Sequence, residues 1–141
     1  MMRAATIAIH EYFSTKTELK VFTEEVGDTS AVVMGFRLKG STNGYTIRFI
    51  SRDDGNDVAV RVFGLVAADE EKADRVLRAV NQLNRRFRFT KFVMGDDNRV
   101  HVEYDFGVST PDLIEGVKEI IARFVKIIEE AYPELMRAMW S

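Results

Sequence analysis

The sequence predicts an α+β fold, an antiparallel sheet with flanking helices in the order α-β-β-β-β-α-β-β-α. Four consecutive segments in the first half alternate apolar and polar residues, the period of a strand with one covered face. Three other stretches, one at each end and one between, carry apolar residues at helical spacing. Because strands come in runs and do not alternate singly with helices, the pattern is not that of a parallel sheet.

The first predicted element is a short amphipathic helix that ends near Ser14. Met2, Ile9 and Phe13 fall on one side of its helical wheel, whereas Ile7 does not. Four strands are then predicted, over residues 19–24, 30–38, 44–51 and 57–63. These segments read as an antiparallel meander.

Turn chemistry and side-chain alternation support the meander. Asn43-Gly44 and Asp54-Gly55 supply the positive φ angles that tight hairpins require. Arg37, Lys39 and Arg61 are predicted to face away from the apolar side of their strands. The residues predicted to share that apolar side are Val32, Met34, Phe36 and Leu38, and Val58, Val60 and Val62. One face of the sheet is therefore expected to be covered and the other partly wet.

A helix and a second hairpin follow. The helical stripe comprises Ala73, Val76, Leu77, Val80, Leu83 and Phe87, with acidic residues at its start and Arg85 and Arg86 in its last turn, as the helix dipole favours. Strands are predicted over 89–94 and 99–106. The last helix is predicted to begin at Thr110 as N-cap with Pro111 next, and Pro133 to interrupt it, leaving Glu134 to Trp140 as a kinked turn or a separate short helix.

The bulk composition predicts one domain, residues 1–141, in the cytoplasm. A chain of 141 residues with 46% apolar and 30% charged residues has the composition of a single globular core. The net charge of -2 provides no global field toward nucleic acid or an anionic membrane. There is no cysteine, no apolar run long enough for a signal peptide, and none near the roughly 20 residues that span a bilayer.

The stretch 74–104 resembles the YbjN family. The residues that carry the resemblance are Ala79, Val80, Asn81, Leu83, Asn84, Phe87, Phe89, Lys91, Phe92, Val100, Val102, Glu103 and Tyr104. Members are described as bacterial sensory-transduction regulators and resemble small dimeric secretion chaperones in fold. The resemblance implies a secretion-chaperone-like domain and carries over no catalytic residue. This sequence departs from the family at Phe87, where tryptophan is frequent, and in its Met-rich tail after Pro133.

Two polar clusters have residue types that bind metals. His101, Glu103 and Asp105 share one strand face, a spacing that could hold a divalent cation, but we interpret them as a solvated polar face. Asp53, Asp54, Asn56 and Asp57 resemble a calcium loop without its ligand ladder or its distant glutamate, and a hairpin turn explains them. We therefore predict no metal and no cofactor.

A basic-aromatic segment, 85–91, supplies an alternative function. Its arginines and lysine interleave with phenylalanines, a pattern that can clamp phosphates and stack bases in a nucleic-acid-binding regulator. The same phenylalanines also continue the helical stripe and then the core face of the next strand, so that a structural role competes with the functional one. An enzyme is the third candidate, but the sequence contains no nucleophile elbow, phosphate-cradling loop or dinucleotide motif, and we predict none.

The last helix carries more apolar surface than one layer of sheet covers. Its apolar residues span roughly 160°, whereas packing on one sheet uses about 100°. Met136, Met139 and Trp140 extend this surface at helical spacing, and methionines adapt to varied partners. These three residues are the predicted partner-binding site of a non-catalytic regulator or chaperone-like module that buries an apolar protein segment. The competing interpretation is that they belong to the core. The same surplus, with the resemblance, predicts a homodimer.

Overall fold

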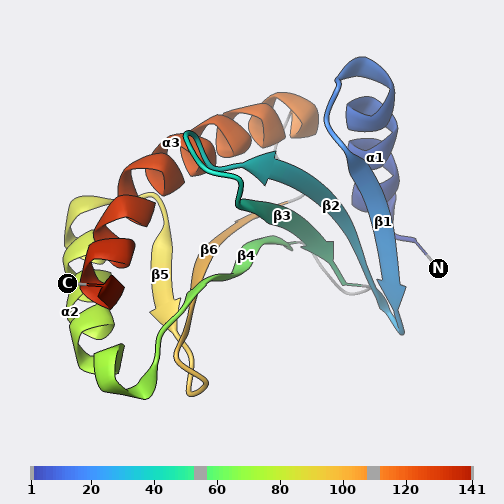
Figure 1. Cartoon of the computed structure of the whole chain (residues 1–141). Helices are drawn as coiled ribbons and strands as arrows, with labels where there is room; N and C mark the ends of the chain where they lie inside the picture. The colour runs from blue at the N-terminus through green and yellow to red at the C-terminus, as the bar shows by residue number, and fades with distance from the viewer. Residues whose placement is uncertain (1, 53–56, 108–111, 141) are drawn as a thin grey trace. The chain divides into compact units, whose positions relative to one another are not determined.

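The computed structural model describes residues 2–52, 57–107 and 112–140. Within them the chain forms, in order, α1 (Ala4–Lys16), β1 (Val21–Val26), β2 (Thr29–Arg37), β3 (Gly44–Ser51), β4 (Asp57–Ala67), the 3-10 turn η1 (Glu70–Lys72), α2 (Ala73–Arg86), β5 (Lys91–Met94), β6 (Arg99–Gly107) and α3 (Leu113–Trp140) (Figure 1). This order confirms the predicted α+β class and the predicted succession of elements.

The six strands form one sheet in the order β1-β2-β3-β4-β6-β5. The pairings β1 with β2, β2 with β3, β3 with β4 and β5 with β6 are all antiparallel. Because β6 inserts between β4 and β5, the outer strands of the sheet are β1 and β5. The backbone contacts divide the chain into two compact units, Met1–Arg61 with Asp105–Ile121 and Val62–Tyr104 with Ala122–Ser141.

In the first unit α1 packs on β1, β2 and β3. Ile9 and Phe13 of α1 are buried, and beside them the Thr6 and Ser30 hydroxyls lie 2.8 Å apart in a buried hydrogen bond. The backbone N–H of Arg3 also donates to Ser30 Oγ, at 3.0 Å. This pair of contacts anchors the start of the chain to β2 and satisfies hydroxyl groups that burial alone would destabilise.

The first turns of α3 belong to the same unit. Lys118 Nζ lies 3.0 Å from Glu115 Oε1 and 4.9 Å from the centre of the Tyr12 ring of α1. Hydrogen bonds to Tyr12 and Glu115 raise the pKa of Lys118, and desolvation opposes them with a smaller effect than either hydrogen bond. The cation thus joins the N-terminal part of α3 to α1.

β2 is buried on both of its faces. Val33 is fully buried, although it points away from the side of Ser30 and α1. Its cross-strand neighbours are Phe22 of β1 and Arg48 of β3, and Arg48 Nε lies 3.2 Å from Glu24 Oε1. The partly wet face that the alternation predicts is therefore closed locally over β2 by an aromatic ring and an ion pair.

In the second unit α2 packs on β5 through buried Val76, Val80 and Leu83. Asn84 ties the two elements together, because its Nδ2 donates to the Phe92 carbonyl at 2.8 Å and its Oδ1 accepts the Phe92 N–H at 2.7 Å. Leu77 was predicted in the core stripe of α2, and this is wrong: it is 52% exposed, because the stripe is narrower than the sequence pattern.

Several element boundaries differ from the predicted ones. β4 continues to Ala67, beyond the predicted end at Phe63, because Gly64 adopts a φ of 62° and donates its N–H to His101 Nδ1 at 2.9 Å without leaving the sheet. α3 continues through Pro133 to Trp140 as one helix. Asp112 Oδ1 accepts the N–H of Glu115 at its start, and the predicted cap at Thr110 and Pro111 lies outside the described residues.

Candidate partner-binding site

The three predicted partner-binding residues lie on the last two turns of α3. Trp140 is 70% exposed, and Met136 and Met139 are half-buried. Leu135, immediately before Met136, is fully buried. At about 100° per residue, Trp140 lies roughly 140° around the helix from Leu135. The tail is therefore divided, with Leu135 in the core and Trp140 directed to solvent.

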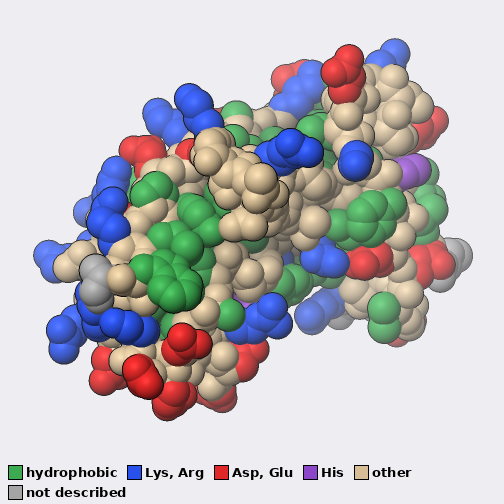
Figure 2. Space-filling model, viewed as in Figure 1, with side chains coloured by type: hydrophobic (Ala, Val, Ile, Leu, Met, Phe, Trp, Pro, Cys, Tyr) green, Lys and Arg blue, Asp and Glu red, His purple; other side chains and the backbone are tan. Residues whose placement is uncertain are grey.

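The apolar surplus of α3 is visible along the part of the helix in the second unit. Val125 and Tyr132 are half-buried, whereas the residues that face inward are buried: Phe124, Ile127, Ile128, Ala131 and Leu135. Figure 2 shows hydrophobic side chains gathered over the C-terminal part of α3. One side of the helix thus completes the core, and the adjoining side leaves apolar area in contact with water.

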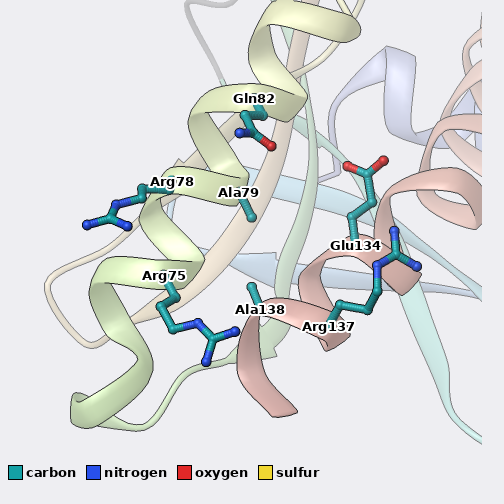
Figure 3. Close-up of a pocket in the computed structure, with 7 residues that line it drawn as sticks. All are labelled: Arg75, Arg78, Ala79, Gln82, Glu134, Arg137 and Ala138. Atoms are coloured by element: carbon teal, nitrogen blue, oxygen red, sulfur yellow. The ribbon is translucent and has the colours of Figure 1, made fainter. Parts of the chain in front are cut away.

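A groove of about 420 Å³ lies beside this tail, between α2 and the end of α3 (Figure 3). Its lining consists of Arg75, Arg78, Ala79, Gln82, Glu134, Arg137 and Ala138. The figure shows the methyl groups of Ala79 and Ala138 directed into the space between the two helices, with Arg75 extending toward α3 and Arg78 pointing away from it. Small side chains between the helices leave the space open, and three of the lining residues are arginines.

Arg86 joins the two helices at one end of the groove. Its Nη2 lies 3.0 Å from Glu130 Oε1 and its Nη1 lies 2.5 Å from Glu134 Oε1. The three side chains are each partly exposed, so that solvent screening limits the stabilisation to a small contribution per pair. The ion pairs hold Glu134, the acidic residue of the groove lining, against Arg86 of α2.

In the basic-aromatic segment 85–91 the two phenylalanine rings are half-buried, and the arginines and the lysine are exposed. Phe89 stacks on Tyr104 with ring centres 4.3 Å apart and meets Phe124 edge-on at 6.4 Å. Phe92, which follows the segment, is buried, and Phe87 lies under the Arg86 guanidinium at 4.7 Å. Base stacking on Phe89 would require removing it from its contacts with Tyr104 and Phe124.

The polar trio on β6 makes local contacts. His101 Nδ1 accepts the Gly64 N–H, and the His101 ring meets Phe63 edge-on at 5.6 Å. Asp105 pairs with Arg61 at 2.7 Å. In the part of the chain that the structure describes, no three His, Asp or Glu side chains gather in a way that could hold a metal ion. Of the calcium-like loop, Asp57 begins β4, and Asp53, Asp54 and Asn56 lie outside the described residues.

Among the described helices, none combines the length and the apolarity that a transmembrane segment requires.

Sequence reasoning missed the arginines around the groove. Arg75 and Arg78 are three residues apart on α2, and this spacing is visible in the sequence. On its own it indicates only an ordinary solvent-exposed helix face. Arg137 is some sixty residues away along the chain, and only the packing of α3 against α2 brings it to the same groove.

A comparison with protein families gives a match. The model of the family described as T3SS (YopN, CesT) and YbjN peptide-binding chaperone 1, TY-Chap1, matches residues 41–136. The matched range extends from just before β3 to Met136 and includes Arg75 and Arg78, but not Met139 or Trp140. Neither the curated proteins nor the solved structures give a match.

Proposed function

The chain belongs to the TY-Chap1 family of peptide-binding chaperones, and from this premise we propose that it is a non-catalytic chaperone or regulator that binds an apolar segment of a partner protein at the end of α3. The family supports a protein-binding role, and the resemblance to YbjN proteins inferred from the sequence is confirmed. The proposal adds the place of binding, through Met136, Met139 and Trp140.

The exposure of Trp140 is the observation that carries this proposal. A tryptophan that is 70% exposed leaves a large apolar area in water, and tryptophan is among the residues most enriched at the energetic centres of protein interfaces. The half-buried Met136 and Met139 extend the same surface with flexible side chains that fit different partner shapes. The three residues together make a small adaptable apolar surface rather than a preformed catalytic pocket.

The test uses the fact that Trp140 is the only tryptophan of the chain, so that intrinsic fluorescence reports its surroundings. Synthetic peptides with a Leu- and Phe-rich block should shift the Trp140 emission to shorter wavelength on binding. Trp140→Ala should weaken the binding of a dye-labelled peptide about 30-fold, the equivalent of about 2 kcal/mol, measured by fluorescence anisotropy.

The matched control is Leu77→Ala, which removes a 52% exposed apolar side chain from α2 instead of α3. It should leave the peptide affinity within about twofold of the wild type. Equal affinities for the wild type and Trp140→Ala would contradict the proposed site.

We also propose that the protein acts in the cytoplasm as a homodimer that uses the half-buried flank of α3. Val125 and Tyr132 on that flank keep apolar area exposed in a single copy, as an interface between copies would require. Sedimentation equilibrium at micromolar concentration should give twice the chain mass. A monomer mass would contradict the proposed homodimer and would not bear on the proposed peptide site.

A further inference from the structure

We propose that the groove between α2 and the end of α3 binds acidic side chains of the partner segment, next to the apolar contact at Trp140. The inference rests on the proposed function and adds a chemical class to it: the partner carries Asp or Glu residues beside its apolar block. The groove is made within one compact unit, from Arg75, Arg78 and Arg137 around small side chains.

The charge of the lining favours an anion. Three of the lining residues are arginines and one, Glu134, is acidic. The lining therefore carries more basic than acidic side chains, and Glu134 also forms an ion pair with Arg86, outside the lining. Figure 2 shows Lys and Arg side chains gathered over α2 and the end of α3 on a chain whose net charge is -2. Planar guanidinium groups bind carboxylates through paired hydrogen bonds.

The size of the groove fits side chains rather than a folded surface. Its volume of about 420 Å³ is at the lower end of the range for ligand sites, enough for a few residues of an extended or helical segment. Ala79 and Ala138 present methyl groups there, and a larger residue at either position would fill the space (Figure 3). The opening between the helices is therefore set by these two small residues.

The groove and the apolar tail are close enough to bind one segment. Ala138 and Arg137 line the groove, and Trp140 lies two and three residues after them on the same helix. Residues three apart on a helix are neighbours on its surface, so that Arg137 adjoins Trp140. A segment whose apolar residue covers Trp140 thus places its next residues near the arginines.

The same observations disfavour nucleic acid as the occupant. The phenylalanine that would best stack on bases in the neighbouring basic segment, Phe89, is held between Tyr104 and Phe124. A nucleic acid carries a negative charge at every nucleotide, and the acidic net charge of the protein would repel those outside the groove. A peptide can carry its negative charges only in the residues that enter the groove.

The experiment compares four dye-labelled synthetic peptides by fluorescence anisotropy. Three share a Leu- and Phe-rich block and carry a flanking block of glutamate, glutamine or lysine, and the fourth carries the glutamate block alone. We expect the glutamate peptide to bind the wild type about tenfold more tightly than the glutamine peptide at low salt, with the difference lost in high salt. The lysine peptide should bind most weakly.

Two variants locate the effect. Arg75→Glu/Arg78→Glu should weaken the glutamate peptide at least tenfold and leave the glutamine peptide unchanged, and Ala79→Leu should reduce both by filling the groove without a change of charge. Arg37→Glu/Arg52→Glu, two exposed residues of the other unit, makes the same change in net charge and should have no effect beyond about twofold. Far-UV circular dichroism and thermal melts establish that each variant is folded.

The outcomes separate this inference from the proposed function. If the glutamate and glutamine peptides bind equally and the arginine variant matches the wild type, the inference is overturned, whereas loss of binding in Trp140→Ala still supports the apolar site. If Trp140 responds to no peptide but the glutamate block alone binds and requires Arg75 and Arg78, acidic binding in the groove is supported and the apolar site at Trp140 is overturned. A single-stranded oligonucleotide that displaces the glutamate peptide at equal concentration would overturn the inference in favour of nucleic acid.

Discussion

Asn84 protects an edge of the sheet with one side chain. β5 is an outer strand, and its Phe92 presents a backbone N–H and a carbonyl that β6 does not engage on that side. The Asn84 amide bonds both groups, at 2.7 and 2.8 Å. The Phe92 carbonyl needs a donor and the Phe92 N–H needs an acceptor, and the asparagine amide supplies both. Asn84 is one of the residues that carry the resemblance to YbjN proteins.

Asn84→Ala should therefore destabilise the fold by about 1 to 3 kcal/mol, because it leaves two part-buried backbone groups without their partner. Urea unfolding followed by circular dichroism measures this change. Gln82→Ala, which removes an exposed amide from the same helix, should change the stability by no more than about 0.5 kcal/mol. Similar values for the two variants would mean that water replaces the Asn84 hydrogen bonds.

Leu135 and Trp140 mark the limit of what the tail sequence could predict. Leu135, Met136, Met139 and Trp140 are all apolar at helical spacing, and the pattern alone does not tell core from surface. Only the packing of α3 places Leu135 inside and leaves Trp140 outside.

Leu135→Ala should cost about 2 to 5 kcal/mol of stability, the usual range for emptying a fully buried position. Met139→Ala, on a half-buried side chain, should cost less than half as much. Chemical denaturation of both variants makes the comparison, and equal costs would show that Met139 is as much part of the core as Leu135.

At the scale of elements, periodicity predicted the order of helices and strands because alternation and helical spacing depend only on residues that are close in sequence. The errors arose where a local signal was overruled by packing. Gly64 reads as the end of a strand, but its N–H bonds His101 and β4 continues to Ala67. Pro133 reads as a break, but α3 continues because Leu135 beyond it is held in the core. The arginine groove needed the pairing of α2 with α3, which no local pattern encodes.

Gly64→Ala should destabilise the fold by about 1 to 2 kcal/mol or more, because an alanine at a φ of 62° is strained. A Cβ there would also lie 3.1 Å from Arg99 Nε. Gly27→Ala is the matched control, since its φ is 57° but no atom lies within 4 Å of the added carbon. Thermal unfolding of both variants separates backbone strain from the Arg99 contact, and a Gly64→Ala that is no worse than Gly27→Ala would assign the whole effect to strain.

At the scale of the whole molecule, three elements run through both compact units. β4, β6 and α3 each contribute residues to the two sets. An element shared in this way cannot keep half of its hydrogen bonds when one unit unfolds without fraying the rest. The single domain 1–141 stays a prediction, which the cooperativity of unfolding tests.

Calorimetry should therefore show one transition, with the calorimetric and van't Hoff enthalpies equal within error. Proline substitution at Ile121, where α3 passes from one unit to the other, should lower the midpoint of that one transition rather than split it. Two resolved transitions in the wild type would show that the units unfold separately and would contradict the single domain.

The unequal edges of the sheet limit how copies of this protein can polymerise. Along β1, Phe22 is 50% and Val26 77% exposed, whereas the opposite edge is blocked at Phe92 by Asn84. Two molecules that joined strand to strand along β1 would each be left with only the blocked edge, so that the assembly would stop at a pair. A fibre built by endless edge-to-edge addition needs two open edges per subunit, and the Asn84 hydrogen bonds close β5 at Phe92.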